Sequence, residues 1–153
     1  MDDFGLRFHH FGLAVPEPSA AFRFLAAMGY ADGAAVFDPL QNVHVAMRHH
    51  PSMPDVEVVW PKERGSPIDR MLQRGHMVYH LCYITDDAER TLVAMEAAGL
   101  TIMPLGEPKP ALLFGGTPVS FHTIDQVGMI ELIHGEPAAG RLQSSSEARQ
   151  NAL

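Results

Sequence analysis

The chain has 153 residues, of which 46% are apolar and 19% charged, and its formal net charge is −7 with neutral histidines. These values are ordinary for a globular domain, and the acidic balance argues against nucleic acid or an anionic membrane as a partner. A single cysteine, an acidic N-terminal stretch and no apolar run near the ~20 residues that span a bilayer predict a cytoplasmic protein with neither a disulfide, a membrane span nor a signal peptide.

The first half of the chain reads as strand, helix and three strands. The apolar run 10–15 predicts a strand, and a proline-containing break follows it. Ser19 is the expected helix cap, because Phe22, Leu25 and Met28 then recur every third residue. Three β-like stretches come after Gly29, at residues 34–38, 42–47 and 55–60.

The second half repeats this order after a linker at residues 62–77, which contains a short predicted helix over 66–73. A strand at 80–85 leads to a helix capped by Thr85, Asp86 or Asp87, with Leu92 and Met95 in its apolar stripe. Strands are expected at 101–104, 118–124 and 128–134. The polar residues 136–153 are predicted to form a mobile tail.

The two halves align as an internal repeat. His10 lies over His80 and Gly29 over Gly99, an offset of 70 residues, and Glu57 lies over Glu131 at an offset of 74. We therefore expect one domain over residues 1–135, made of a module at 6–61 and a second at 78–135.

Each module contributes one histidine on its first strand and one glutamate on its last. Two open sheets related by a pseudo-two-fold axis would bring His10, Glu57, His80 and Glu131 to one point. A glutamate between apolar neighbours is costly to bury unless it is paired or ligating, and two imidazoles with two carboxylates suit a divalent metal. The plainer alternatives are a structural histidine and a glutamate on a solvent-facing strand surface.

The stretches "HHFGLAV", "VEVVWP", "SPI", "YHLCYITDD" and "GMIELI" resemble the vicinal oxygen chelate (glyoxalase/bleomycin resistance) superfamily, and most closely its methylmalonyl-CoA epimerase-like members. The resemblance implies an α+β fold in which two paired βαβββ modules form a cupped, partly open β-barrel with helices outside. It places one divalent ion (Co, Ni, Mn, Zn or Fe) on His10, Glu57, His80 and Glu131. It also implies a homodimer.

The resemblance further implies an epimerase or isomerase that removes the α-proton of an acyl thioester, such as an acyl-CoA, through a metal-stabilised enolate. Glu131 is the expected base. A second acid or base is expected in "LQNVHVAM", where the candidates are Gln41 and His44, although His44 also fits the wet face of a strand. The predicted substrate-binding residues are Gln41, His122, Phe114, Gly115 and Gly116.

Several residues have two interpretations. Phe114, Gly115 and Gly116 either border the substrate cavity or form a plain hairpin turn. His122, in the equivalent strand of the second half, is ambiguous in the same way as His44: it either serves the site or lies on the wet face of a strand. The basic residues of the linker either meet the phosphates of coenzyme A or are solvated surface groups: Lys62, Arg64, Arg70 and Arg74.

The remaining histidines are expected to lie outside the site. Strand alternation predicts that His9 points away from His10 and that His134 faces away from Glu131. Surface positions are expected for His49, His50 and His76, and a small buried role for Cys82.

Two other functions compete with the epimerase. A glyoxalase I-type lyase acting on a hemithioacetal would use the same ligands, and a binding or resistance module would hold a small molecule without turnover. An extradiol dioxygenase is disfavoured, because its iron takes two histidines and one carboxylate.

Overall fold

The structure is a computed structural model that describes residues 3–75 and 77–138, so His76 and most of the predicted tail, residues 139–153, lie outside the described residues. The first half comprises β1 (Arg7–Ala14), α1 (Ser19–Ala27), β2 (Ala35–Asp38), β3 (Val43–Arg48) and β4 (Asp55–Pro61). A short helix, α2 (Asp69–Gln73), precedes the second half: β5 (Val78–Thr85), α3 (Ala88–Ala97), β6 (Ile102–Pro104), β7 (Lys109–Pro110), the 3-10 turn η1 (Leu112–Phe114), β8 (Pro118–Ile124) and β9 (Gly128–His134).

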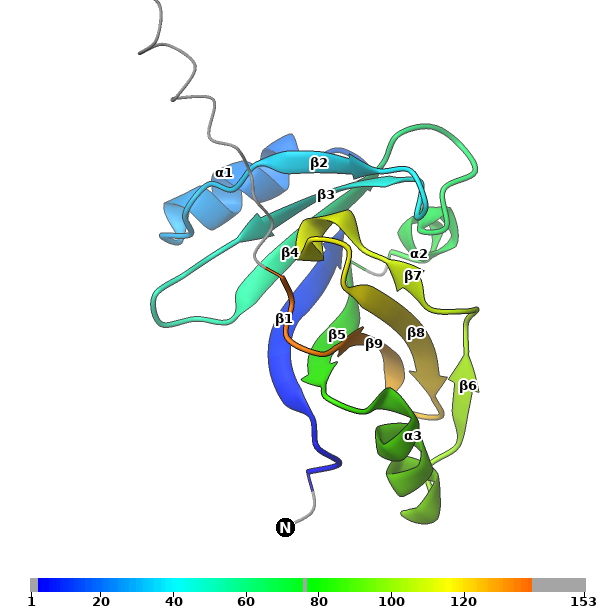
Figure 1. The fold of residues 1–153 in the computed structure, drawn as a ribbon. Coiled ribbons are helices and arrows are strands. Elements are labelled where there is room, and N and C mark those ends of the chain that lie inside the picture. Colours follow the sequence, from blue (N-terminus) through cyan, green and yellow to red (C-terminus); the bar gives the residue numbers. More distant parts are fainter. Residues whose placement is uncertain (1–2, 76, 139–153) are drawn as a thin grey trace, which may run out of the picture.

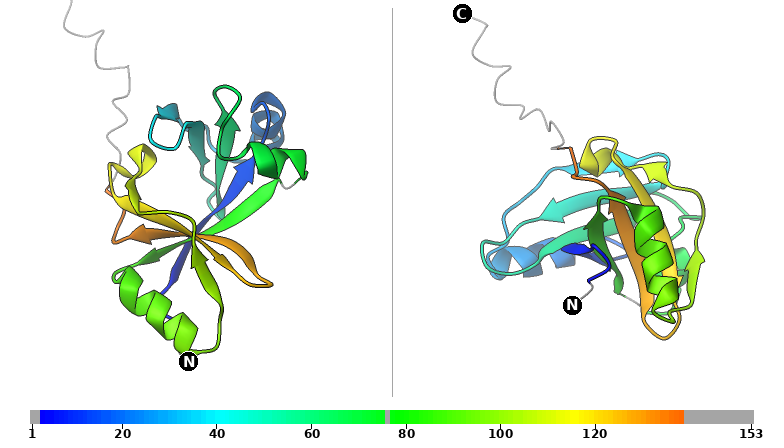
Figure 2. Two further views of the ribbon diagram at one scale, coloured as in Figure 1. Left: turned by 90° about the vertical axis from the view of Figure 1, so that its right-hand side faces the viewer. Right: turned by 60° about the horizontal axis from the view of Figure 1, so that its bottom comes forward.

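The strands form one curved sheet in the order β2-β3-β4-β1-β5-β9-β8-β6, with β7 paired to β8. The two halves join where β1 runs antiparallel to β5, and each half folds round so that the sheet is cupped (Figures 1 and 2). The predicted α+β class is therefore confirmed, and so are the cupped arrangement and the helices outside it.

The register at the centre of the sheet has two-fold symmetry. His10 pairs with Cys82 and Gly12 with His80, while Phe11 faces Leu81 between them. Because residue 12 is equivalent to residue 82 at the offset of 70, the first two pairs are related by the repeat. The outer pairs follow the same rule, with Gly12 opposite Glu57 in the parallel pair β1–β4 and Cys82 opposite Glu131 in β5–β9.

Apolar side chains on the outer face of the sheet hold the two longer helices. Leu25 of α1 packs with Val15 and Val58, and Met95 of α3 packs with Ile130 and Leu132. The concave face is therefore left free of long helices. No helix within residues 3–75 and 77–138 is long and apolar enough to cross a membrane.

The helix ends correct one sequence prediction. Helix α1 has Pro18 at its N-cap and no side-chain cap, because the Ser19 hydroxyl donates to the Glu17 carboxylate instead, so the predicted Ser19 cap is wrong. Helix α3 is capped by Asp87, one of the three expected residues, whose carboxylate accepts from the Arg90 amide at 2.9 Å.

Candidate metal centre

Four side chains meet on the concave face where the two halves join. His10 lies on β1, Glu57 on β4, His80 on β5 and Glu131 on β9. All four are buried, with exposed fractions of 0% for His10, 2% for His80 and Glu131, and 6% for Glu57. They share one face because Gly12 pairs with both His80 and Glu57, and Cys82 with both His10 and Glu131.

The donor atoms are spaced as ligands of one ion would be. Nε2 of His10 lies 3.5 Å from a carboxylate oxygen of Glu57 and 3.5 Å from one of Glu131. Nε2 of His80 lies 3.6 Å from Glu57, 3.1 Å from Glu131 and 3.2 Å from Nε2 of His10. Donors about 2.0–2.2 Å from a shared ion would be about 2.8–3.6 Å apart between a right angle and the tetrahedral angle. The four side chains could therefore hold one divalent metal.

The carboxylates of this cluster stabilise a positive charge beside them. Burial lowers the pKa of His10, but its contacts with Glu131 and Glu57 outweigh burial and raise the pKa to about 9. Burial raises the pKa of Glu131, yet the rings of His10 and His80 outweigh it and lower that pKa below its usual range. Without a metal, a proton on His10 thus supplies one positive charge beside the two carboxylates.

A second observation also fits a metal. The Oε2 atom of Glu131 is buried and accepts no hydrogen bond within the described chain, although an ionised carboxylate has several acceptor sites. A buried acceptor of this kind is costly unless a cation or donor satisfies it. Two imidazole nitrogens with two carboxylate oxygens suit a six-coordinate divalent ion with open positions.

Close packing holds the His80 ring. A Cβ atom added to Gly12 would lie 2.1 Å from Cε1 of His80, so the ring occupies the space that any other residue at position 12 would fill. The rings of Tyr79 and Phe121 contact it edge-on, with centroids 4.4 Å and 5.6 Å away. On the other side of the cluster, the Phe114 ring lies 5.8 Å from that of His10.

A cavity of about 240 Å³ lies beside the cluster, and Tyr79 and Phe121 belong both to its wall and to the surroundings of His80. Gln41, in the loop between β2 and β3, is one of the residues that line this cavity, where a substrate residue was predicted. No described residue hydrogen-bonds to the Tyr79 hydroxyl. Burial and the charges of Glu57 and Glu131 raise the pKa of Tyr79, so the group remains an O–H donor.

A second hollow continues from the cavity towards α2. The two share Tyr79, Met71 and Met129, and His80 lines the second one together with Arg70 and Arg74. The other basic residues of the predicted stretch are not among the residues that line it. The Lys62 ammonium lies 4.5 Å above the Phe37 ring instead.

The structure places His44 away from the cluster. Met47 is the β3 residue paired with Glu57, whereas His44 pairs with Trp60, three positions along, and so occupies the outer face. Its ring stacks on Trp60 with centroids 5.4 Å apart. The alternative interpretation of a histidine on the other strand face matches this placement, and no second acid or base is supplied from position 44.

His122 also lies on the outer face. Phe121 pairs with Glu131, so the next side chain along β8 points the other way. Nε2 of His122 lies 2.9 Å from the Ser120 hydroxyl, which is 2.8 Å from Nε2 of His134. Burial lowers the pKa of both histidines. The predicted substrate role of His122 thus has no support from its position.

The predicted hairpin residues separate. Phe114 is buried against the cluster, whereas Gly115 and Gly116 form a turn with φ angles of 64° and 88° and line neither hollow. The plain-turn interpretation therefore suits the two glycines, and Phe114 supports His10 rather than the cavity wall.

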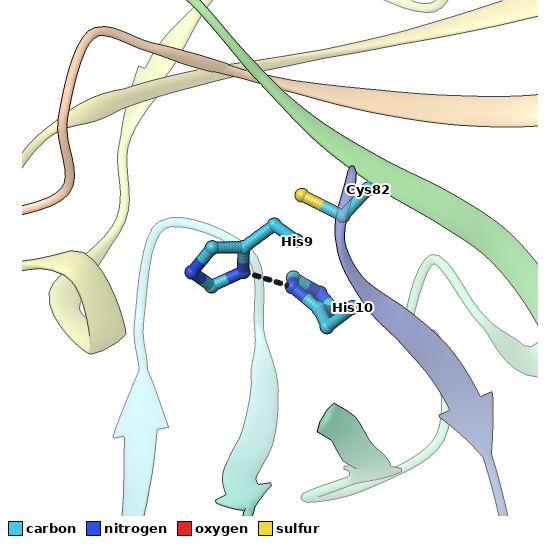
Figure 3. A group of neighbouring side chains, drawn as sticks. All are labelled: His9, His10 and Cys82. Atoms are coloured by element: carbon cyan, nitrogen blue, oxygen red, sulfur yellow. Dashed lines mark hydrogen bonds between the residues drawn. The ribbon is translucent and has the colours of Figure 1, made fainter. Parts of the chain in front are cut away.

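Sequence reasoning missed His9 and Tyr79. The prediction that His9 points away from His10 is wrong, because Nδ1 of His9 lies 2.7 Å from Nδ1 of His10 (Figure 3). Burial lowers the pKa of His9. Both residues precede a histidine of the cluster and lie over each other in the repeat, which was the available signal.

The sequence matches a family profile and a known protein. Residues 9–121 match the profile of the Glyoxalase/Bleomycin resistance protein/Dioxygenase superfamily. The chain is 30% identical over 106 residues to an ethylmalonyl-CoA/methylmalonyl-CoA epimerase of Cereibacter sphaeroides, which covers 67% of this chain and 78% of that protein.

Solved structures share the fold. A hypothetical protein from Bacillus halodurans superposes with a TM-score of 0.72 at 18% identity, covering 88% of this chain and 97% of that one. Methylmalonyl-CoA epimerase from Mycobacterium tuberculosis gives a TM-score of 0.68 at 17% identity, covering 87% and 89%. A variant of the Streptomyces coelicolor epimerase in complex with 2-nitronate-propionyl-CoA gives 0.67 at 18%, covering 87% and 96%.

Proposed function

Since the chain belongs to the glyoxalase/bleomycin resistance protein/dioxygenase superfamily, we propose that it is a divalent-metal-dependent epimerase that moves the α-proton of an acyl-CoA thioester. The observation that carries the proposal is the buried set of two imidazoles and two carboxylates beside a cavity. The 30% identical relative supports the substrate class, since it is an epimerase of ethylmalonyl-CoA and methylmalonyl-CoA.

In this proposal His10, Glu57, His80 and Glu131 hold the metal. A divalent ion bound there would polarise a substrate oxygen and stabilise the negative charge that develops as the α-proton leaves. Glu131 takes that proton, and a proton that returns to the other face of the α-carbon inverts its configuration. The lowered pKa of Glu131 keeps its carboxylate ionised at neutral pH.

Tyr79 and Gln41 orient the substrate. The Tyr79 hydroxyl has no partner in the described chain, stays protonated and lies on the cavity wall next to His80, so it donates a hydrogen bond to a substrate oxygen. The Gln41 amide supplies donors and an acceptor from the opposite half of the molecule.

The second hollow provides the path for the carrier group. It opens from Tyr79 towards Arg70 and Arg74, whose guanidinium groups suit the phosphates of coenzyme A. A substrate with its acyl group at His80 and its phosphates near α2 would occupy both hollows. A cytoplasmic homodimer is part of the same proposal.

The test measures metal and proton exchange separately. Metal content is determined by mass spectrometry, and α-proton exchange is followed by NMR in deuterated water with methylmalonyl-CoA, ethylmalonyl-CoA and propionyl-CoA. Exchange is expected in the wild type and absent in Glu131→Gln. The matched control is His44→Gln, on the outer face, which retains wild-type exchange.

Other results would redirect the proposal. Bound metal without exchange of any thioester would favour the glyoxalase I-type lyase, to be assayed with a hemithioacetal. Neither metal nor exchange would favour a binding or resistance module. Full exchange in Glu131→Gln would remove Glu131 as the base.

A further inference from the structure

The two histidines of the metal centre each follow a β-bulge. In the β1–β5 ladder Phe8 pairs with Tyr83 and His10 with Cys82, so His9 has no partner of its own. Further along, Gly12 pairs with His80 and Leu13 with Val78, which leaves Tyr79 unpaired. A bulge re-aims the side chain of its extra residue, and here it turns both onto the cluster side of the sheet.

The two bulge residues contact their histidines differently. The Nδ1 atoms of His9 and His10 are 2.7 Å apart, within hydrogen-bond distance (Figure 3). Tyr79 meets His80 only through its ring, and Nδ1 of His80 is buried without a hydrogen-bond partner. The repeat has therefore kept the bulge and changed its chemistry.

The short contact fixes the tautomers of both rings once His10 is a ligand. Nε2 of His10 faces His80, Glu57 and Glu131, so a metal there needs its lone pair. The ring proton must then be on Nδ1, and among the described residues the acceptor within hydrogen-bond distance is Nδ1 of His9. His9 in turn carries its proton on Nε2.

We infer that His9 is a positioning residue, which holds His10 in the metal-binding tautomer and orientation by accepting the Nδ1–H hydrogen bond. Outer partners of this kind raise the basicity of a histidine ligand, and their loss typically weakens metal binding about 10–100-fold. The Phe114 ring meets His9 edge-on at 5.5 Å and keeps it in place.

Cys82 is the third member of this group (Figure 3), since the potential ligand atoms of His9, His10 and Cys82 lie within 4.8 Å of one another. A separate metal on these three would need the Nδ1 lone pair of His10 and a thiolate. Burial raises the pKa of the Cys82 thiol, and Glu131 and Glu57 raise it further. The hydrogen bond between His9 and His10 requires neither a second free lone pair on His10 nor a thiolate on Cys82, so we assign the contact as a hydrogen bond.

The inference rests on the metal centre of the proposed function, and its test separates the two. Metal-free wild type, His9→Phe, His9→Asn and Tyr79→Phe are titrated with Co²⁺ against a competing chelator. His9→Phe keeps an aromatic ring against Phe114 but has no acceptor, whereas Asn places an amide oxygen where Nδ1 was. Thermal unfolding of each metal-free variant reports whether it folds.

We expect one Co²⁺ per chain in the wild type and about 10–100-fold weaker binding in His9→Phe. His9→Asn should recover most of that loss, and Tyr79→Phe, the matched control at the equivalent bulge, should bind as the wild type does. In ¹⁵N NMR of the Zn²⁺-loaded wild type, Nδ1 of His10 should carry a slowly exchanging proton, while Nδ1 of His9 carries none.

Five results would overturn the inference. Wild-type affinity in His9→Phe, or equal losses in His9→Phe and His9→Asn, would show that the acceptor does not matter while leaving the metal centre intact. A proton on Nδ1 of His9 in the NMR spectrum would contradict it without any mutation. Two ions in the wild type and one in His9→Phe would assign the group with Cys82 to a second metal. No binding by the wild type would remove the metal centre itself.

Discussion

Gly12→Ala adds a single methyl group, and we expect it to disrupt the proposed metal centre. Gly12 lies on β1 directly opposite His80, and the imidazole of His80 covers its Cα. An alanine Cβ at this position would lie 2.1 Å from Cε1, 2.3 Å from Nδ1 and 2.6 Å from Nε2 of His80. The repeat-equivalent residue, Cys82, carries a side chain, so the steric demand exists in one half only.

The size of the effect follows from these distances. To restore an ordinary contact of about 3.4 Å, the ring must withdraw by about 1.3 Å from its 2.1 Å approach. Metal–ligand distances tolerate only about ±0.2 Å, so His80 would leave the coordination sphere. Since loss of an outer partner alone costs about 10–100-fold, we expect Gly12→Ala to weaken metal binding by more than about 100-fold. Overpacking should also destabilise the metal-free fold by about 1–3 kcal/mol.

Chelator competition gives the affinity, and urea unfolding of the metal-free protein gives the stability. Cys82→Ala is the matched control, because it changes the equivalent position without a collision and should retain wild-type affinity within a few-fold. In a His80→Ala background the collision partner is gone, so Gly12→Ala should no longer destabilise the fold. Wild-type metal affinity in Gly12→Ala would show that the ring of His80 does not lie against Gly12.

Four further predictions concern protons and the cavity. Because the pKa of His10 is raised to about 9, a metal ion must displace a proton from His10 at neutral pH. The apparent metal affinity should therefore rise about tenfold per pH unit from pH 7 to 9 and then level off. An affinity that does not change with pH would show that His10 carries no such proton. The same raised pKa of His10 contributes to the free energy of unfolding of the metal-free protein. This contribution is fully present below the unfolded pKa of about 6.5 and is lost as the pH rises through about 9, and urea unfolding at pH 6–10 would measure it. His122 and His134 act in the opposite sense: their lowered pKa values make stability full above about pH 6.5 and declining below it, and asparagine at both positions should flatten that decline. Tyr79→Phe should lower kcat for proton exchange by about 10-fold or more with unchanged metal affinity, and an unchanged kcat would show that its hydroxyl does not contact the substrate.

The fold and the four-residue cluster could be predicted because the two halves of the chain carry the same order of elements, with a histidine and a glutamate at equivalent positions. One glutamate between apolar neighbours, such as Glu57, is uninformative, but Glu131 at the equivalent position makes chance a poor explanation. Strand alternation then places each glutamate, and the pairings of Gly12 and Cys82 bring all four side chains to one face.

The positions of the side chains around the cluster could not be predicted from the repeat and strand alternation. Alternation predicts that His9 faces away from His10, and a single bulge reverses that result, because one extra residue shifts the side chain to the other face. A bulge leaves no mark in composition or periodicity. For His44 the sequence offered both faces of β3, and only its pairing with Trp60 decides between them.

The symmetry of the ligands does not extend to the space around them, and the cause is a difference in loop length. Four residues, 39–42, connect β2 to β3, whereas residues 105–117 connect the equivalent strands β6 and β8. The first part of this longer connection, including Leu105 and Lys109, lines the cavity beside Tyr79. Its second part, η1, instead packs Phe114 against His9 and His10. Within the described residues, one side of the four-residue cluster is thereby filled by the chain itself and the other is left hollow, so the proposed substrate would approach the cluster from the side of Tyr79.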